Sequence, residues 1–171
     1  MTFDTETLGE GIAALLPRLR RFGRTVTRNR EDADDLVQLA VERALNRAGQ
    51  WQPGTRLDSW MFRIMQNAWI DEVRSRVRRA ETFVPAEEGE HIGVSTTDAQ
   101  IDAIAVRKAV AQLGEDQRVV VGLVLVEGLP YKEAADVLGI PIGTLTSRLA
   151  RAREALQAAL STDLSTNGNP P

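Results

Sequence analysis

The stretch from Gly128 to Arg153, GLPYKEAADVLGIPIGTLTSRLARAR, constrains the fold more than any other part of this 171-residue chain. It predicts two short helices joined by a tight turn. Gly139 suits a left-handed residue in that turn, and Pro141 suits the start of the second helix, where a missing N–H costs little. The apolar residues that would pack the two helices together are Leu129, Ala134, Ala135, Val137, Leu138, Ile140, Leu145 and Leu149.

The polar residues of the second helix remain for solvent or for a DNA groove. They are Thr144, Thr146, Ser147, Arg148, Arg151 and Arg153. Hydroxyl and guanidinium groups contact phosphates and base edges, so a helix-turn-helix with this face favours DNA binding. On this stretch alone, the alternative is an ordinary helical hairpin with a solvated basic face.

The net charge of −3 hides an uneven distribution of charge. Residues 12–80 carry 14 arginines against 8 acidic residues, whereas residues 81–108 carry 6 acidic residues against 2 basic ones. Because local potential decides where a polyanion binds, the acidic average does not exclude DNA.

Composition excludes several classes of protein. The 43% hydrophobic content is enough for buried cores. The sequence contains no run of about 18 apolar residues, so we expect no membrane span. The N-terminus is acidic and lacks the apolar core of a signal peptide. With no cysteine and His91 as the only histidine, the sequence predicts no metal site, no cofactor and no catalytic triad. We expect a cytoplasmic protein that is not an enzyme and does not insert into a membrane.

Periodicity predicts an all-α fold of two small helical domains. In the first domain, residues 10–80, we expect helices over residues 12–27, from Asp32 to Gly49, and over residues 58–79. Pro17 must lie near the start of its helix or kink it. The inward stripe of the second helix is Ala33, Leu36, Val37, Ala40, Val41, Ala44, Leu45 and Ala48.

Residues 81–97 are acidic, contain Gly and Pro and have no period, which predicts a flexible linker. Helix resumes near Asp98 for a second domain, residues 98–160. The run VVVGLVLV within residues 116–127 favours a strand by propensity, but no strand partner exists elsewhere, so we expect a buried helix. Residues 161–171 are expected to form a frayed, disordered tail.

Four sequence motifs together resemble the extracytoplasmic-function (ECF) sigma factors, the two-domain bacterial initiation factors that direct core RNA polymerase to promoters. They are DADDLVQ at 32–38, LDSWMFRIMQNAWIDEVR at 57–74, QR at 117–118 and EGLPYKEAADVLGIPIGTLTSRLARAR at 127–153. The resemblance covers about residues 15–160. It implies a sigma region 2-like bundle at the N-terminus and a sigma region 4-like helix-turn-helix at the C-terminus.

The resemblance implies that the second helix docks on the clamp helices of the polymerase's largest subunit. The residues it assigns to polymerase binding are Asp32, Asp35, Leu36, Gln38, Leu39 and Glu42. Leu39 departs from the family pattern, in which an acidic residue usually follows the glutamine. Without the family, a solvated acidic helix end that complements the helix dipole explains this face equally well.

The segment from Gln50 to Arg79 holds all three tryptophans, Phe62 and six arginines, a mixture suited to single-stranded DNA. In the family this domain recognises the −10 element and captures a flipped base, and the loop at residues 51–59 would line the base pocket. The assigned residues are Trp51, Arg56, Phe62, Arg63, Asn67, Asp71, Arg74, Arg76, Arg78 and Arg79. Trp60 and Trp69 are expected in the core, whereas Phe62 and the arginines are less easily buried.

For the C-terminal domain the resemblance implies binding to the −35 element, with a recognition helix that runs from Thr144 to about Ala159. The assigned residues are Tyr131, Lys132, Thr144, Thr146, Ser147, Arg148, Arg151 and Arg153. Thr146 stands where the family often carries Lys, which suggests an altered sequence preference. The implied partners are the polymerase clamp helices, the flap of the second-largest subunit, promoter DNA and an anti-sigma factor.

Two rival functions differ in the partners they need. A freestanding helix-turn-helix regulator would bind duplex DNA without polymerase, typically as a dimer on a palindrome. A decoy module would bind an anti-sigma factor without initiating transcription. An enzyme is the most remote alternative, because no set of nucleophile, base and oxyanion donors can be assembled from the sequence.

Overall fold

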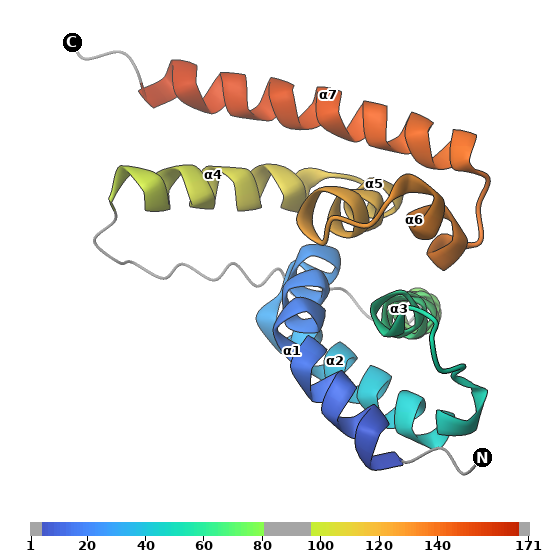
Figure 1. Cartoon of the computed structure of the whole chain (residues 1–171). Helices are drawn as coiled ribbons and strands as arrows, with labels where there is room; N and C mark the ends of the chain where they lie inside the picture. Colours follow the sequence, from blue (N-terminus) through green and yellow to red (C-terminus); the bar gives the residue numbers. More distant parts are fainter. Residues whose placement is uncertain (1–4, 81–96, 168–171) are drawn as a thin grey trace.

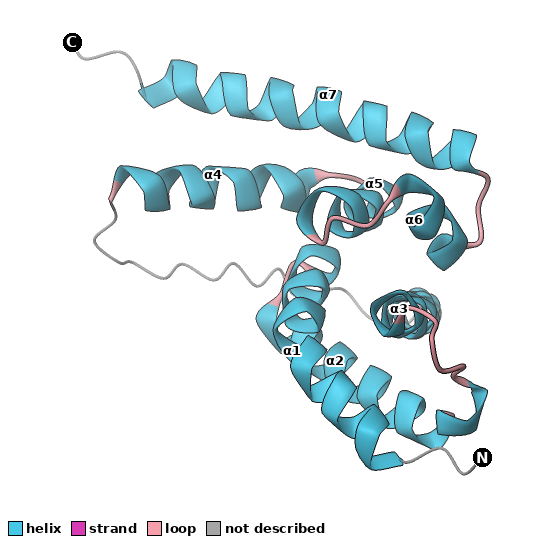
Figure 2. Cartoon of the chain, viewed as in Figure 1, coloured by secondary structure: helices cyan, strands magenta, loops and turns pink. Residues whose placement is uncertain are grey.

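The computed structural model describes residues 5–80 and 97–167, and every regular element in these ranges is a helix (Figures 1 and 2). The N-terminal half contains α1 (Thr5–Thr27), α2 (Arg30–Asn46), the 3-10 turn η1 (Ala48–Gln50) and α3 (Leu57–Ala80). The C-terminal half contains α4 (Asp98–Gln112), α5 (Glu115–Val121), the π-helical turn η2 (Gly122–Val126), α6 (Tyr131–Leu138) and α7 (Ile142–Asn167). The all-α expectation is confirmed.

The N-terminal half is built on apolar stripes at helical spacing, with α1 packed along α2 and α2 along α3. Its buried side chains include Leu8, Ile12, Leu19, Phe22, Val26, Ala33, Leu36, Val37, Ala40, Ala44, Met61, Met65 and Trp69. The predicted stripe of α2 is buried at most positions, but Leu45 is 41% exposed. Its expected inward position is therefore wrong, because Leu45 lies one residue before the end of α2, beside Asn46.

Helix α1 begins at Thr5, earlier than the sequence predicts, and Pro17 lies in its interior. Proline removes the N–H that would bond to the carbonyl of Ala13. Ala13 is exposed, so water can satisfy that carbonyl. The chain then turns at Arg28, which has a φ of 63°, and Asn29 caps α2 by accepting a hydrogen bond from the Asp32 N–H at 3.1 Å.

The apolar run near residue 120 is helical, as expected, with Val119, Val120, Val121 and Leu123 buried. It comprises α5 and η2, and Gly128, with a φ of 70°, ends it. Strand propensity is overridden here because burial between helices, rather than the β-branched backbone preference, decides the conformation.

The helix-turn-helix has the predicted turn. Gly139 is left-handed, with a φ of 64° and a ψ of 33°, and the Ile140 N–H bonds back to the Ala135 carbonyl at 3.1 Å. Pro141 directly precedes α7, and its carbonyl accepts hydrogen bonds from the N–H groups of Thr144 and Leu145. Both sequence expectations for this turn are confirmed.

Helix α7 runs to Asn167, beyond the point near Ala159 where the sequence predicts its end. The tail expected from Ser161 is helical as far as Asn167, because the first helix-breaking residue after Ser161 is Gly168. The linker predicted at residues 81–97 lies outside the described residues except for Thr97, which caps α4 in a capping box with Gln100.

The two halves share one hydrophobic core. α5 and η2 pack on α1, and α6 packs on α3 (Figure 1). Gly122 permits a close approach of η2 to α1, because a Cβ at this position would stand 3.0 Å from the Phe22 ring. None of the helices in the described ranges is both long and apolar enough to span a membrane.

Candidate nucleic-acid interface

One face of α2 carries the residues that the sequence assigns to polymerase binding. Asp35, Gln38 and Glu42 are exposed, and Asp32 and Leu39 are half-buried. Leu36 is only 5% exposed and belongs to the core, so it supports this face from beneath. Five of the six assigned residues therefore present side chains at the surface.

The loop between α2 and α3 encloses a pocket of about 510 Å³. Trp51, Arg56 and Trp60 line it from the N-terminal half, together with Arg63. Glu133 of α6 closes one side, so the C-terminal half contributes to this pocket. An aromatic wall beside guanidinium groups is suited to holding a base and its phosphate.

Asp58 fixes the arginine at this pocket. Its carboxylate accepts hydrogen bonds from Arg56 at 3.1 and 2.9 Å and from Arg18 at 3.0 Å. Burial alone would raise the pKa of Asp58, but the two guanidinium groups and the Ser59 N–H outweigh it and lower the pKa to about 2. Asp58 is therefore ionised at neutral pH and holds Arg56 in place.

Phe62 differs from the sequence expectation. It is fully buried rather than accessible to a base, and its ring meets Phe22 edge-on with centroids 5.0 Å apart. The guanidinium of Arg18 lies 5.4 Å from the ring centroid. Trp69 is 6% exposed and Trp60 is half-buried, and both pack in or against the core, as expected. Phe62 is buried because it lies on the face of α3 that packs into the core.

The face of α3 expected to read DNA is exposed at Asn67, Asp71 and Arg74. Asp71 already pairs with Arg43 at 3.2 Å. Arg74 lines a cleft of about 300 Å³ between the two halves, and Arg148 of α7 lines the same cleft. Residues that the sequence assigns to two separate promoter elements therefore lie on one cleft.

The arginines at the end of α3 differ in how strongly ion pairs hold their side chains. Arg76 forms a bidentate pair with Asp32 at 2.9 and 2.8 Å, and it also bonds to Glu72 and lies over the Trp69 ring. These carboxylates raise the pKa of Arg76. Arg79 pairs more weakly with Glu72 at 3.3 Å. Arg76 thus joins α2 to α3, whereas Arg78 makes no ion pair with any described residue.

The second helix of the helix-turn-helix presents a polar face. Thr146, Ser147, Arg151 and Arg153 are exposed, as are Tyr131 and Lys132 of α6, while Thr144 and Arg148 are half-buried. Arg148 has Asp116 at 3.8 Å, a distance that leaves its guanidinium weakly held. Four of the eight assigned residues stand within the first two turns of α7, where the helix dipole favours phosphate.

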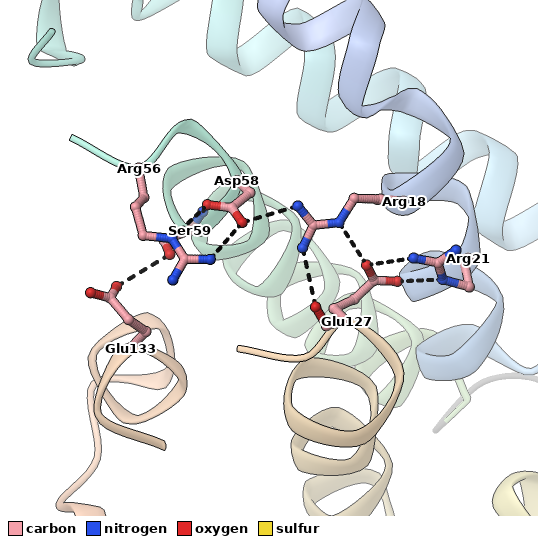
Figure 3. A network of polar contacts seen from close by, with 7 residues as sticks. All are labelled: Arg18, Arg21, Arg56, Asp58, Ser59, Glu127 and Glu133. Carbon is pink, nitrogen blue, oxygen red and sulfur yellow. Dashed lines mark hydrogen bonds and ion pairs between the residues drawn. The ribbon is translucent and has the colours of Figure 1, made fainter. Parts of the chain in front are cut away.

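A network that the sequence did not indicate joins the two halves at this interface (Figure 3). The buried carboxylate of Glu127 accepts hydrogen bonds from Arg18 at 3.0 Å and from Arg21 at 2.8 and 3.0 Å. The Ser59 hydroxyl donates to Glu133 at 3.3 Å. The one local signal was a carboxylate directly after an apolar run, which indicates a buried charge but not its partners.

Two further contacts reinforce this network. Arg63 Nη2 donates to the Asp136 carbonyl at 2.9 Å. Arg118, which is 5% exposed, donates to the carbonyls of Val26 and Leu113, so it bridges the end of α1 and the end of α4. Burial and the charge of Arg28 lower the pKa of Arg118. Both arginines bind backbone carbonyls across the boundary between the halves, which sequence patterns cannot indicate.

Family models match one region in each half of the chain. The Sigma2 domain of PhyR matches residues 12–66, and the region 4 model of sigma-70 matches residues 103–156. With the helical fold and the exposed polar face of α7, these matches define a two-region sigma factor of the sigma-70 type.

Full-length relatives narrow this class. The ECF RNA polymerase sigma factor EcfG of Rhodopseudomonas palustris (strain TIE-1) is 35% identical over 159 residues, which cover 93% of this chain and 88% of the relative. The ECF RNA polymerase sigma factor SigM of Mycobacterium tuberculosis (strain ATCC 25618 / H37Rv) is 37% identical over 144 residues, which cover 84% of this chain and 71% of the relative. The chain belongs to the ECF RNA polymerase sigma factors, and is thus a transcription initiation factor rather than a freestanding regulator.

A solved structure shares the arrangement of both regions. The sigma factor RpoE in its co-crystal with the anti-sigma factor NepR from Bartonella quintana matches with a TM-score of 0.78 and 29% sequence identity. The match covers 92% of this chain and 99% of RpoE. The similarity therefore extends over the N-terminal and C-terminal halves together.

Proposed function

We propose that this ECF sigma factor binds core RNA polymerase through the exposed face of α2 and grips promoter DNA with two separate surfaces. The pocket at residues 51–63 and the face around Arg74 take the −10 element, and the polar face of α7 takes the −35 element. The observation that carries this proposal is the presence of an exposed, arginine-bearing surface in each of the two family-matched regions. A factor that works on core polymerase acts in the cytoplasm.

The proposed DNA contacts require the two halves to separate. The −10 and −35 elements lie roughly 25 base pairs apart, which is about 85 Å of duplex at 3.4 Å per base pair. Arg74 and Arg148 line one cleft in the present arrangement. Helix α7 has 26 residues and is about 39 Å long, which is less than half of the distance of about 85 Å between the two promoter elements. We call the present packing of the two halves against each other the closed arrangement. In this proposal it is the form that is not bound to a promoter.

Helix α6 also covers part of the proposed −10 surface. Glu133 places a carboxylate beside the pocket at Arg56, and the Asp136 carbonyl holds Arg63. These oxygens occupy positions beside the guanidinium groups that a DNA phosphate would otherwise approach. Movement of α6 would free both arginines, so opening and −10 capture are coupled steps in this proposal.

An anti-sigma factor is the proposed regulator. The support is the match to RpoE in complex with NepR, which extends over both halves of this chain. A partner that prefers the closed arrangement would lower the population able to bind a promoter, by as much as its differential affinity for the two forms.

Run-off transcription with purified core polymerase and genomic promoter fragments tests the function. We expect promoter-dependent transcripts only when the sigma factor is added. Asp35→Arg should weaken binding to core polymerase, because it reverses the charge of an exposed α2 residue. Glu10→Arg, an equal charge change on exposed α1 surface, is the matched control. Absence of any promoter-dependent product would refute the proposal.

A further inference from the structure

Helices α1 and α2 lie side by side (Figure 1), and a groove of about 580 Å³ runs along their junction. Its apolar lining consists of Leu16 of α1 and of Val37 and Val41 of α2, which are buried or half-buried. Sites for small molecules typically measure about 300–1,000 Å³, so this groove has the size of such a site. None of the residues assigned to promoter DNA lines it.

Three arginines line the same groove. Arg20 and Arg24 lie one turn apart on α1, and Arg30 is the first residue of α2. All three are exposed, and none forms an ion pair within residues 5–80 and 97–167. By contrast, carboxylates hold six other arginines of the N-terminal half, which are Arg18, Arg21, Arg43, Arg56, Arg76 and Arg79. The groove arginines are therefore available to an anion.

The neighbouring surface adds to the positive potential. Arg24 and Arg30 also border a second hollow, on the side of α4. The charged residues that line this hollow, among those described, are all arginines: Arg21, Arg24, Arg28, Arg30 and Arg107. Guanidinium groups bind phosphate through charge-assisted hydrogen bonds, so several of them in one place suit several linked phosphates. Neither the promoter faces nor the polymerase face uses the groove arginines.

The groove also carries two polar groups of a different kind. Asp34 and Gln38 lie one turn apart on α2, and both are exposed. A carboxylate accepts hydrogen bonds from hydroxyl or amino groups but repels phosphate, whereas an amide both donates and accepts. A ligand made only of phosphate would meet repulsion at Asp34, whereas a ribose hydroxyl or the amino group of a base would find an acceptor there.

We propose that this groove binds a nucleoside di- or triphosphate. The phosphate chain lies against Arg20, Arg24 and Arg30, and the nucleoside lies over the aliphatic side chains with Asp34 and Gln38 as its hydrogen-bond partners. A longer nucleic acid fits less well. No aromatic ring among the described residues lines the groove to stack an unpaired base, and the convex surface of a duplex does not enter a groove of this size.

A bound nucleotide would compete with polymerase. Gln38 lines this groove and is also one of the residues assigned to polymerase binding on α2. A nucleotide that occupies Gln38 withdraws it from polymerase, and by linkage each ligand lowers the affinity for the other by the same factor. The nucleotide site goes beyond the proposed function, whereas this competition rests on it.

Displacement of mant-ATP, a fluorescent derivative of ATP, tests the site. Fluorescence anisotropy with the full-length sigma factor should show saturable binding of mant-ATP. Unlabelled ATP should displace it at a concentration at least about tenfold lower than tripolyphosphate or adenosine does. Absence of saturable binding, or equal displacement by tripolyphosphate, would overturn the nucleotide assignment. Tighter displacement by a DNA duplex of about 12 base pairs, at equal phosphate concentration, would overturn it in favour of nucleic acid.

Substitutions locate the site. Arg20→Gln combined with Arg24→Gln should weaken mant-ATP binding by about tenfold or more, because two charged donors to phosphate are lost. Arg47→Gln combined with Lys108→Gln makes the same charge change at exposed positions outside the groove and should change the affinity by less than about twofold. Asp34→Ala should reduce the preference for ATP over tripolyphosphate. Circular dichroism melting checks that each variant is folded, and equal weakening by the two double variants would refute the location.

Pull-down with core polymerase tests the competition. At an ATP concentration about ten times its dissociation constant, the wild type should bind polymerase about tenfold more weakly than without ATP. The variant with Arg20→Gln and Arg24→Gln should lose about twofold or less, and it also controls for ATP that binds to polymerase itself. Equal loss in both proteins would overturn the competition. Failure of the wild type to bind polymerase without nucleotide would count against the proposed function and leave the mant-ATP result standing.

Discussion

Arg18 and Glu127 are 109 residues apart in the sequence, and their side chains meet with Nε and Oε2 3.0 Å apart. Arg18 lies on α1, and Glu127 ends the η2 turn, so the contact joins the two halves of the chain. The same guanidinium also donates to Asp58 at 3.0 Å. One arginine therefore connects the boundary between the halves to the carboxylate that positions Arg56.

Glu127→Gln should loosen the closed arrangement. The Glu127 side chain is fully buried and accepts charge-assisted hydrogen bonds from Arg18 and Arg21. An amide of the same shape removes the charge and turns N–H donors toward a guanidinium. We expect the free energy of unfolding in urea to fall by about 1–3 kcal/mol, and the distance between dyes on α2 and α7 to increase.

Glu154→Gln on the exposed surface of α7 is the control for this experiment, and its effect should stay within about 0.5 kcal/mol. If both substitutions changed stability equally, the contact would have no special role in holding the halves together.

Local features of this fold could be predicted because their causes are local. The turn at Gly139 follows from its left-handed backbone, and the inward stripe of α2 follows from a 3.6-residue period. The length of α7 was underestimated because polar residues after Ser161 look like a tail, yet none of them breaks a helix before Gly168.

The contacts between the halves could not be predicted for the opposite reason. The pairing of Arg18 with Glu127 depends on how two helical units dock, which no periodicity encodes. Phe62 shows the same limit: its position among arginines suggested a stacking surface, but its place on α3 turns it toward Phe22. Sequence reasoning identified the polar faces of the candidate site but not which of them face each other.

Acid should destabilise the protein partly through Asp58. Its pKa in the folded protein is about 2, below its ordinary value of 3.8, so its ionised form contributes stability above about pH 4. That contribution is lost as the pH falls from about 4 to about 2, and the shift is worth about 2 kcal/mol.

Asp58→Asn should therefore lower the free energy of unfolding at pH 6, and the difference from wild type should shrink as the pH approaches 2. Urea unfolding at several pH values measures this. A difference between the two proteins that stayed constant over the whole range would contradict the assignment.

Two glycine substitutions should have opposite effects. Gly122→Ala places a Cβ 3.0 Å from the ring of Phe22, which is fully buried and held against Phe62, so the closed packing should weaken by about 1–3 kcal/mol. Gly143→Ala, in α7, meets nothing within 4 Å and should stabilise the helix by about 0.5–1 kcal/mol. Thermal melting of both variants distinguishes a steric effect at the boundary from a general effect of helix propensity.

Arg118→Met should be strongly destabilising although Arg118 forms no ion pair with any residue that the structure describes. Arg118 donates to the carbonyls of Val26 and Leu113, and the apolar side chain leaves both without this donor. We expect a loss of about 2–3 kcal/mol. Arg118→Lys keeps the charge but has no planar fork to reach two carbonyls, so it should restore only part of the loss. Full rescue by Lys would show that charge alone matters at this position.

Arg148→Ala should separate promoter recognition from polymerase binding. Its one ion-pair partner within residues 5–80 and 97–167, Asp116, is 3.8 Å away, so truncation should cost little stability. If Arg148 contacts a base edge or a phosphate of the −35 element, its loss should reduce −35-dependent transcription by about tenfold, equivalent to about 1.4 kcal/mol. Binding to core polymerase, measured by pull-down, should not change. Glu154→Ala on the same helix controls for the truncation itself. Equal loss of transcription and of polymerase binding would refute the division of labour between α7 and α2.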